Sequence, residues 1–486
     1  MKKIVYTFLQ IVWIVYCWFA LSGMQKTSDF SDNVDHLYWI IVISFVLGLL
    51  ETYYLSGKKV SITTAFLVIT YIFHHGQHFL DFLGIDFEYY KGYIMTNFVD
   101  KSIVNATIFS IMAINFLQLG FCLMLNDKDE DKKSYRYKHS SKRQPNSLED
   151  SEKAKARTEL LLKWSIALFA VSLIPTLIYD VQRMIVSFSA SYAETYTYGT
   201  TAINSILSQF FEIAIFGLIY CLKDTKKWKY FYYSKFFWEL IKLLLIGNRM
   251  GPISSIAALF FLKQSIIVSD NKRKGKLKYI VLAILLVFVM GFISSYRSGK
   301  AGTTLTEALE NALVRDNMFI SFFAESGTTL LDQALLFRLM PGTLAFANGL
   351  TYINSILILL PMSTTIFGAS ATEHISIGAI LNEHWYNRGL GGSIVAESYY
   401  NFGENAIWFM LIIGLAVGWF QKKYDSSASK GENGMLIILL TFLLEQLLIY
   451  PRGYFYSVIA SVNIIIYALV VYLLVKMFFD SKKVKA

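Results

Sequence analysis

Twelve apolar stretches constrain the fold of this 486-residue chain more than any other feature. A membrane-spanning helix needs about 20 mostly apolar residues. With 55% hydrophobic and only 16% charged residues, the chain has the composition of a membrane protein. We predict an all-α fold, a polytopic membrane helix bundle of about 12 transmembrane helices that forms one integral membrane domain over residues 1–486. The predicted spans lie at about 4–22, 37–55, 60–82, 102–125, 159–180, 202–222, 235–247, 252–269, 278–296, 404–421, 434–450 and 454–479.

The lysines between these stretches orient the bundle. Of the 45 lysine and arginine residues, 34 fall on one side, and only four of these are arginine. The positive-inside rule makes that side cytoplasmic, and an even number of spans places both termini there. The apolar run that follows Met1–Lys3 is too long for the core of a signal peptide, so it is predicted to be the first span. Topology and anionic lipid explain the net charge of +10, and nucleic acid is not an expected partner.

The opposite face is poor in cations but rich in arginine. It has 11 lysine and arginine residues, and seven of them are arginine. Guanidinium is a planar fork that grips phosphate through two parallel hydrogen bonds, whereas lysine is a point charge. This bias indicates a phosphate-bearing ligand outside the cytoplasm. The seven are Arg183, Arg249, Arg297, Arg315, Arg338, Arg388 and Arg452.

Two long segments separate the predicted helices. Residues 126–158 are charged and nearly free of apolar side chains, so they are predicted to form a disordered cytoplasmic loop. Residues 297–404 form a large extracytoplasmic loop between helices 9 and 10. Short helices are predicted in it, one of them opening near Thr329-Leu-Leu-Asp332. We expect this second segment to be a folded cap that carries the chemistry.

Three outer arginines next to helix ends are candidate anion ligands. Arg249 lies in the turn Gly247-Asn-Arg-Met-Gly-Pro252, just before a helix whose first amides would add to an anion site. Arg297 closes the ninth predicted helix beside Lys300. Arg452 follows Pro451 in the last outer turn. The structural alternatives are arginines that reach the lipid headgroups and, for Arg452, an ion pair with the intramembrane Glu445.

The densest group of reactive side chains lies between residues 373 and 403. It contains Arg388, a glycine run, and two groups able to take a proton from a hydroxyl, His384 and Glu397. Alternatively, Glu397 pairs with an arginine. His374 and His384 have no third ligand in a metal-binding pattern, so we expect no metal and no cofactor.

The turn at residues 247–252, the stretch Gly391–Gly403 and the large outer loop resemble the Wzy family of bacterial O-antigen and capsule repeat-unit polymerases. The resemblance implies a GT-C-like membrane glycosyltransferase in the bacterial cytoplasmic membrane. Its substrates would be oligosaccharides on undecaprenyl pyrophosphate. A flippase and a chain-length regulator would be possible protein partners beside the lipid bilayer.

The resemblance also implies roles for individual residues. Arg249, Arg297 and Arg388 would bind the pyrophosphate, with Arg452 as a fourth. His384 and Glu397 would be alternative catalytic bases for the acceptor hydroxyl. An O-antigen-type ligase, which uses the same donor, remains an alternative. So does a lipid-linked oligosaccharide flippase, a transporter that should show two similar halves rather than one large outer loop.

Overall fold

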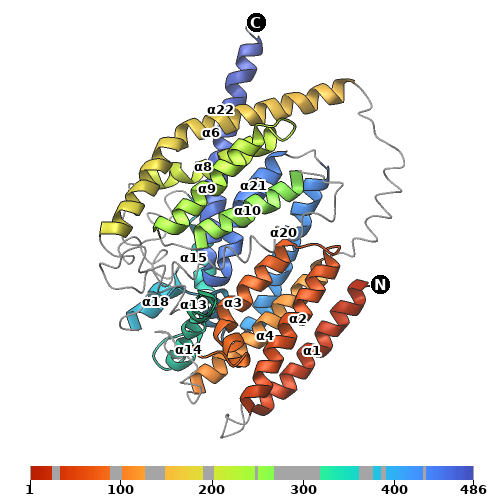
Figure 1. The fold of residues 1–486 in the computed structure, drawn as a ribbon, viewed down its shortest axis with the longest axis vertical. Coiled ribbons are helices and arrows are strands. Elements are labelled where there is room, and N and C mark those ends of the chain that lie inside the picture. The colour runs from red at the N-terminus through yellow and green to blue at the C-terminus, as the bar shows by residue number, and fades with distance from the viewer. Residues whose placement is uncertain are drawn as a thin grey trace. The chain divides into compact units, whose positions relative to one another are not determined.

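The computed structural model describes residues 2–24, 33–87, 101–125, 148–189, 202–246, 250–266, 318–360, 376–384, 390–430 and 434–484. Every regular element in these ranges is a helix (Figure 1), which confirms the all-α prediction. Eight helices of the described part are long and apolar enough to cross a membrane, and Met250–Ile266 is a shorter apolar helix. The fold is therefore a polytopic helical membrane bundle. The number of twelve spans stays a prediction, and the predicted span at 278–296 lies outside the described residues.

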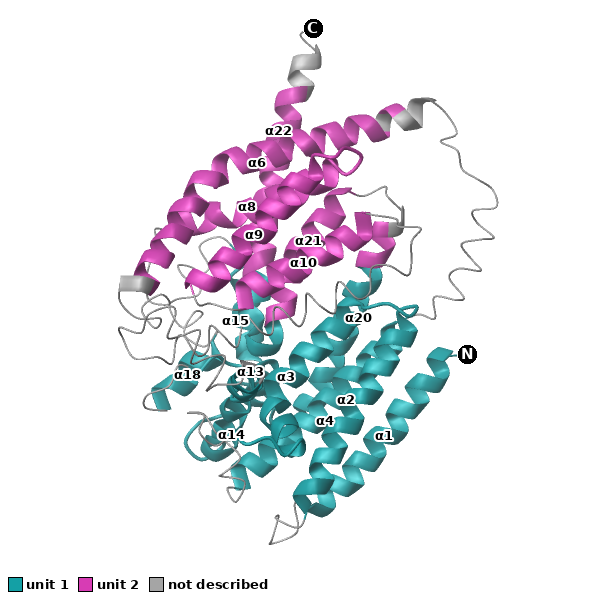
Figure 2. Ribbon diagram, viewed as in Figure 1, with its two compact units in different colours: residues 1–141, 313–423, 450–459 teal, residues 142–312, 424–449, 460–486 magenta. Residues whose placement is uncertain are grey.

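The chain divides into two compact units (Figure 2). Unit 1 comprises residues 1–141, 313–423 and 450–459. It contains four long N-terminal helices, the short helices of the predicted cap, the first part of α20 and the start of α22. These elements are α1 (Lys2–Met24), α2 (Val34–Leu55), α3 (Ile62–Phe82), α4 (Lys101–Met124), α13 (Met318–Gly327), α14 (Leu330–Leu339), α15 (Leu350–Leu357), α18 (Ile377–His384), α19 (Ile394–Phe402), η4 (Gly403–Asn405), α20 (Ala406–Lys430), η5 (Tyr450–Arg452) and α22 (Phe455–Val484).

A buried polar network holds the four N-terminal helices together. The Gln10 amide of α1 donates to Asn115 Oδ1 at 3.1 Å and to Gln118 Oε1 at 3.1 Å in α4. Gln118 in turn donates to the Tyr71 hydroxyl of α3 at 2.8 Å. Between apolar helices, such bonds fix which faces meet, because an unpaired amide in this setting is costly.

Glycine brings α13 directly onto α3. A Cβ on Gly76 would lie 2.5 Å from the Phe323 carbonyl oxygen, and one on Gly327 would lie 2.5 Å from the Gln77 nitrogen. No larger residue fits this backbone contact. Just before it, α3 departs from helical geometry at His75. The contact anchors the cap helices to the bundle, because α14 follows α13 after two residues and packs on α4.

Unit 2 comprises residues 142–312, 424–449 and 460–486. Its helices are α6 (Leu148–Ser189), α8 (Ala202–Cys221), α9 (Trp228–Ile246), α10 (Met250–Ile266), α21 (Gly434–Ile449) and the larger part of α22. The start of α6 differs from the expectation of a disordered loop over 126–158. Residues 126–147 lie outside the described part, but the helix begins at Leu148, where alanine, glutamate and lysine favour helical backbone.

A buried ion-pair network joins the helices of unit 2. Lys235 of α9 pairs with Glu212 of α8, and its Nζ lies 2.5 Å from Glu239 Oε1. Lys242 Nζ lies 2.7 Å from the same Glu239 oxygen. The intramembrane Glu445 of α21 faces this network, with Lys235 and Ser255 among its neighbours. Glu445 thus has polar neighbours of its own, so the Arg452 pairing considered from the sequence is not needed to explain it.

Candidate functional site

The glycine loop at residues 390–393 is held in a conformation that only glycine adopts easily. Gly392 has φ +74°, and a Cβ there would lie 2.8 Å from Ile377 Cγ2. The loop also packs backbone to backbone on α18, since a Cβ on Gly378 would lie 2.6 Å from the Leu390 carbonyl oxygen. Ser393 then caps α19, its Oγ accepting the Ala396 N–H at 3.0 Å. The backbone of the loop is therefore held in a fixed position.

Asp332 lies against this loop. The side chain comes from α14, is 2% exposed, and accepts the backbone N–H of Gly392. Burial raises the pKa of Asp332 from 3.8 to about 7, although the Arg452 charge and the Gly392 amide both act to lower it. A buried acid with a pKa near neutrality can take up or release a proton at physiological pH.

Sequence reasoning missed this role of Asp332. Thr329-Leu-Leu-Asp332 was expected to open a helix, and α14 does begin at Leu330. However, Thr329 caps nothing, because it is itself helical and its hydroxyl donates to the Ser326 carbonyl at 3.0 Å. Asp332 faces the glycine loop instead. The available signal was an acid at the start of an otherwise apolar helix.

Arg452 completes the cluster. Its guanidinium lies 5.4 Å from the centroid of the Phe73 ring in α3, a cation–π contact. A methyl group on Gly391 would lie 3.5 Å from Arg452 Nε, so the guanidinium runs along the glycine loop. Arg452 remains partly exposed. A fixed, accessible arginine beside glycine amides is an arrangement that binds anionic oxygens.

Glu397 is buried beside the cluster and has no exposed surface. Its Oε1 accepts the Thr351 hydroxyl at 3.1 Å, and its Oε2 accepts the Phe455 N–H at 2.9 Å. Asn401 reinforces the arrangement by donating to Thr351 Oγ1 at 2.7 Å. Both oxygens therefore already accept hydrogen bonds. The residue ties α15 and α19 to the first residue of α22, three positions after Arg452.

Of the other predicted site residues, the structure describes only His384. His384 is the last residue of α18 and is exposed. The preceding turn is fixed to the glycine loop, since Asn382 Oδ1 accepts the Leu390 N–H at 3.0 Å. Arg249, Arg297 and Arg388 lie outside the described residues. The structure thus brings Arg452 and Glu397 into one region, since α19 packs on η5, and adds Asp332 to it.

Within the described part of the chain, no group of three or more histidine, cysteine, aspartate or glutamate side chains could hold a metal ion. The polar groups that the site offers are the Arg452 guanidinium, the Gly391 amide and the buried Asp332 carboxyl group. With these groups the site can bind an anionic oxygen and exchange a proton.

Comparison with known proteins adds one finding. The family model of the O-antigen polysaccharide polymerase Wzy matches residues 2–482, nearly the whole chain. No curated protein and no solved structure matches it significantly.

Proposed function

Because the chain belongs to the O-antigen polysaccharide polymerase Wzy family, we propose that it transfers a growing glycan from undecaprenyl pyrophosphate to an incoming lipid-linked repeat unit. The reaction would take place at the outer face of the bacterial cytoplasmic membrane, with both termini in the cytoplasm. Family membership makes the chain an integral membrane polymerase that acts on lipid-linked repeat units. The donor, the acceptor and the orientation are our extension of that statement.

In this reaction the terminal hydroxyl of the acceptor sugar attacks the anomeric carbon of the growing chain. A new glycosidic C–O bond forms, the C–O bond to pyrophosphate breaks, and undecaprenyl pyrophosphate leaves with the bonding electrons. The hydroxyl proton passes to a base. Charge grows on the leaving pyrophosphate, so fixed donors near it lower the barrier. The reaction needs no nucleotide sugar, because the donor is already activated.

The observation that carries the proposal is Arg452 beside the glycine loop. Its guanidinium would bind the pyrophosphate together with the Gly391 amide. Arg249, Arg297 and Arg388 are the further pyrophosphate ligands that we propose from the sequence. They would neutralise the charge that develops on the leaving pyrophosphate, a role that a metal ion has in other enzymes.

Two residues are proposed as the proton acceptor, Asp332 and His384. We favour Asp332 for two reasons. It lies close enough to Arg452 for the arginine charge to lower its pKa, and that pKa is about 7, where a base is most effective. His384 is exposed at the end of α18 and is joined to the same loop only through Asn382. Glu397, with both oxygens occupied, is proposed as a positioning residue for Arg452 rather than as the base.

The test is elongation by purified protein in liposomes that contain lipid-linked repeat units from the producing bacterium. We expect polymer to grow without added nucleotide sugar. Asp332→Asn should lower the rate by about 10²–10⁴, the usual contribution of a positioned base, and His384→Ala should lower it much less. If the His384→Ala variant is inactive while the Asp332→Asn variant remains active, His384 is the base. Dependence on nucleotide sugar would refute the donor assignment.

A further inference from the structure

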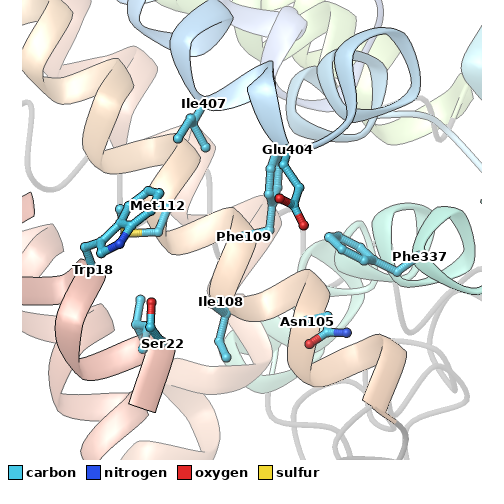
Figure 3. Close-up of a pocket in the computed structure, with 10 residues that line it drawn as sticks. Trp18, Ser22, Asn105, Ile108, Phe109, Met112, Phe337, Glu404 and Ile407 are labelled. Carbon is cyan, nitrogen blue, oxygen red and sulfur yellow. The ribbon is translucent and has the colours of Figure 1, made fainter. Parts of the chain in front are cut away.

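Unit 1 contains a cavity that the proposed reaction does not use. Its walls come from the C-terminal turns of α1, the N-terminal half of α4, the end of α14 and the start of α20 with η4 (Figure 3). Its cavity volume is about 170 Å³. Trp18, Phe109 and Phe337 supply aromatic surface, and Asn105 and Glu404 supply polar groups. Figure 3 shows the Glu404 carboxylate beside the Phe109 ring, facing the side on which Phe337 and Asn105 lie.

The chemistry of this pocket suits a neutral, hydroxylated ligand. Sugar rings offer C–H faces to aromatic rings and hydroxyl groups to carboxylate and amide groups. Glu404 is exposed and, among the described residues, has no cation within salt-bridge distance. An unpaired carboxylate repels a phosphate headgroup but accepts hydrogen bonds from hydroxyls. Apolar walls with a few polar groups that fix orientation are the usual composition of a small-molecule site.

The same short helices carry the pocket and the proposed reaction site. Phe337, which lines the pocket, lies five residues after Asp332 in α14, about 7.5 Å along the helix axis. Its ring stacks on Tyr399 of α19 with centroids 4.2 Å apart, and Tyr399 also meets the Phe109 ring at 5.0 Å. One oligosaccharide could therefore reach both places, and a ligand in the pocket would be held by the helices that position the reacting groups.

We propose that this pocket binds the saccharide part of the repeat unit, with a sugar ring against Trp18 and its hydroxyls on Glu404 and Asn105. The assignment of the sugar to a repeat unit rests on the proposed polymerase function. The pocket would hold the glycan near the glycine loop between successive transfers. It would thus lower the KM for lipid-linked units without taking part in bond formation.

Binding is tested with full-length purified protein and a lipid-free probe, the oligosaccharide released by mild acid from the bacterium's own lipid-linked repeat units. Trp18→Leu and Glu404→Gln should each weaken binding by about tenfold, the loss expected for one stacking contact or one charge-assisted hydrogen bond. The matched control is Trp408→Leu. Trp408 is 57% exposed, against 52% for Trp18, and neighbours Ile407 of the pocket without lining it. It should bind the probe like wild type.

Three outcomes would overturn the sugar assignment: no binding by wild type, equal binding by all variants, or displacement of the probe by polyprenol, which would make the pocket a lipid site. Because binding is measured without turnover, its result does not depend on the reaction. If Trp18→Leu and Glu404→Gln elongate lipid-linked units with the wild-type KM, the saccharide site is refuted and the proposed polymerase function is unaffected. If both variants lose probe binding while the wild-type protein binds the probe but cannot elongate lipid-linked units, the result would support the saccharide site and contradict the polymerase function.

Discussion

Replacing Asp332 with asparagine should change how the stability of this protein depends on pH. The side chain is 2% exposed, and its burial raises the pKa from 3.8 to about 7. The folded protein therefore holds this proton more tightly than the unfolded chain does. The stability that the protonated group contributes is fully present below pH 3.8 and is lost as pH rises through about 7.

The size of the effect follows from the two pKa values. One pH unit of difference corresponds to about 1.4 kcal/mol, so the interval from 3.8 to about 7 corresponds to a cost of about 4 kcal/mol for the charged form at high pH. About 3 kcal/mol of this would develop between pH 5 and 8. Asparagine keeps an oxygen for the Gly392 amide but never ionises, so the variant should lack this cost.

The assay is thermal unfolding followed with a thiol-reactive dye, because Cys17 and Cys122 are buried and Cys221 is partly buried. The apparent Tm of wild type should fall relative to Asp332→Asn by several degrees between pH 5 and 8. At pH 8 the variant should be the more stable protein and the poorer polymerase. Parallel Tm curves for the two proteins would refute the assignment of a buried, near-neutral carboxyl group to Asp332.

Three further perturbations test other parts of the site. Arg452→Lys keeps the charge but loses the planar guanidinium fork, so elongation should fall by about 10²–10³. The control is Arg338→Lys, exposed in α14, and normal polymer from both variants would exclude phosphate recognition by Arg452. Glu397→Gln leaves the Phe455 N–H or the Thr351 hydroxyl without an acceptor, which should destabilise the protein by about 1–3 kcal/mol; an unchanged Tm would contradict the positioning role. In a cysteine-free background, a cysteine at residue 370 should react with an impermeant thiol reagent in intact cells and one at residue 140 should not; the reverse pattern would invert the topology.

Most helices could be predicted from the sequence because each apolar run is a local signal. The apolar runs of α4 and α21, for example, need no distant partner to be recognised as spanning candidates. The predicted bounds differ from the observed ones at two helix starts. α9 begins at Trp228 rather than at residue 235, and α6 begins at Leu148 inside the segment expected to be disordered. Charged and polar residues extend α6 beyond its predicted span, and mainly aromatic residues extend α9.

The site was less predictable, because its contacts join residues far apart in the chain. Asp332 and Arg452 are 120 positions apart, and only the packing of α14, α19 and η5 brings them to one loop. From the local pattern, Asp332 was interpreted only as a residue at the start of a helix. Glu397 was recognised as unusual, but its two hydrogen-bond donors, Thr351 and Phe455, could not be inferred from spacing.

The most direct test of the proposed reaction is its stoichiometry in liposomes that contain only the purified protein and lipid-linked repeat units. One undecaprenyl pyrophosphate should be released for each glycosidic bond formed, without nucleotide sugar, and Arg452→Lys should slow both processes together. Polymer growth without release of undecaprenyl pyrophosphate would contradict transfer from a lipid pyrophosphate. So would release of the lipid without growth of the polymer.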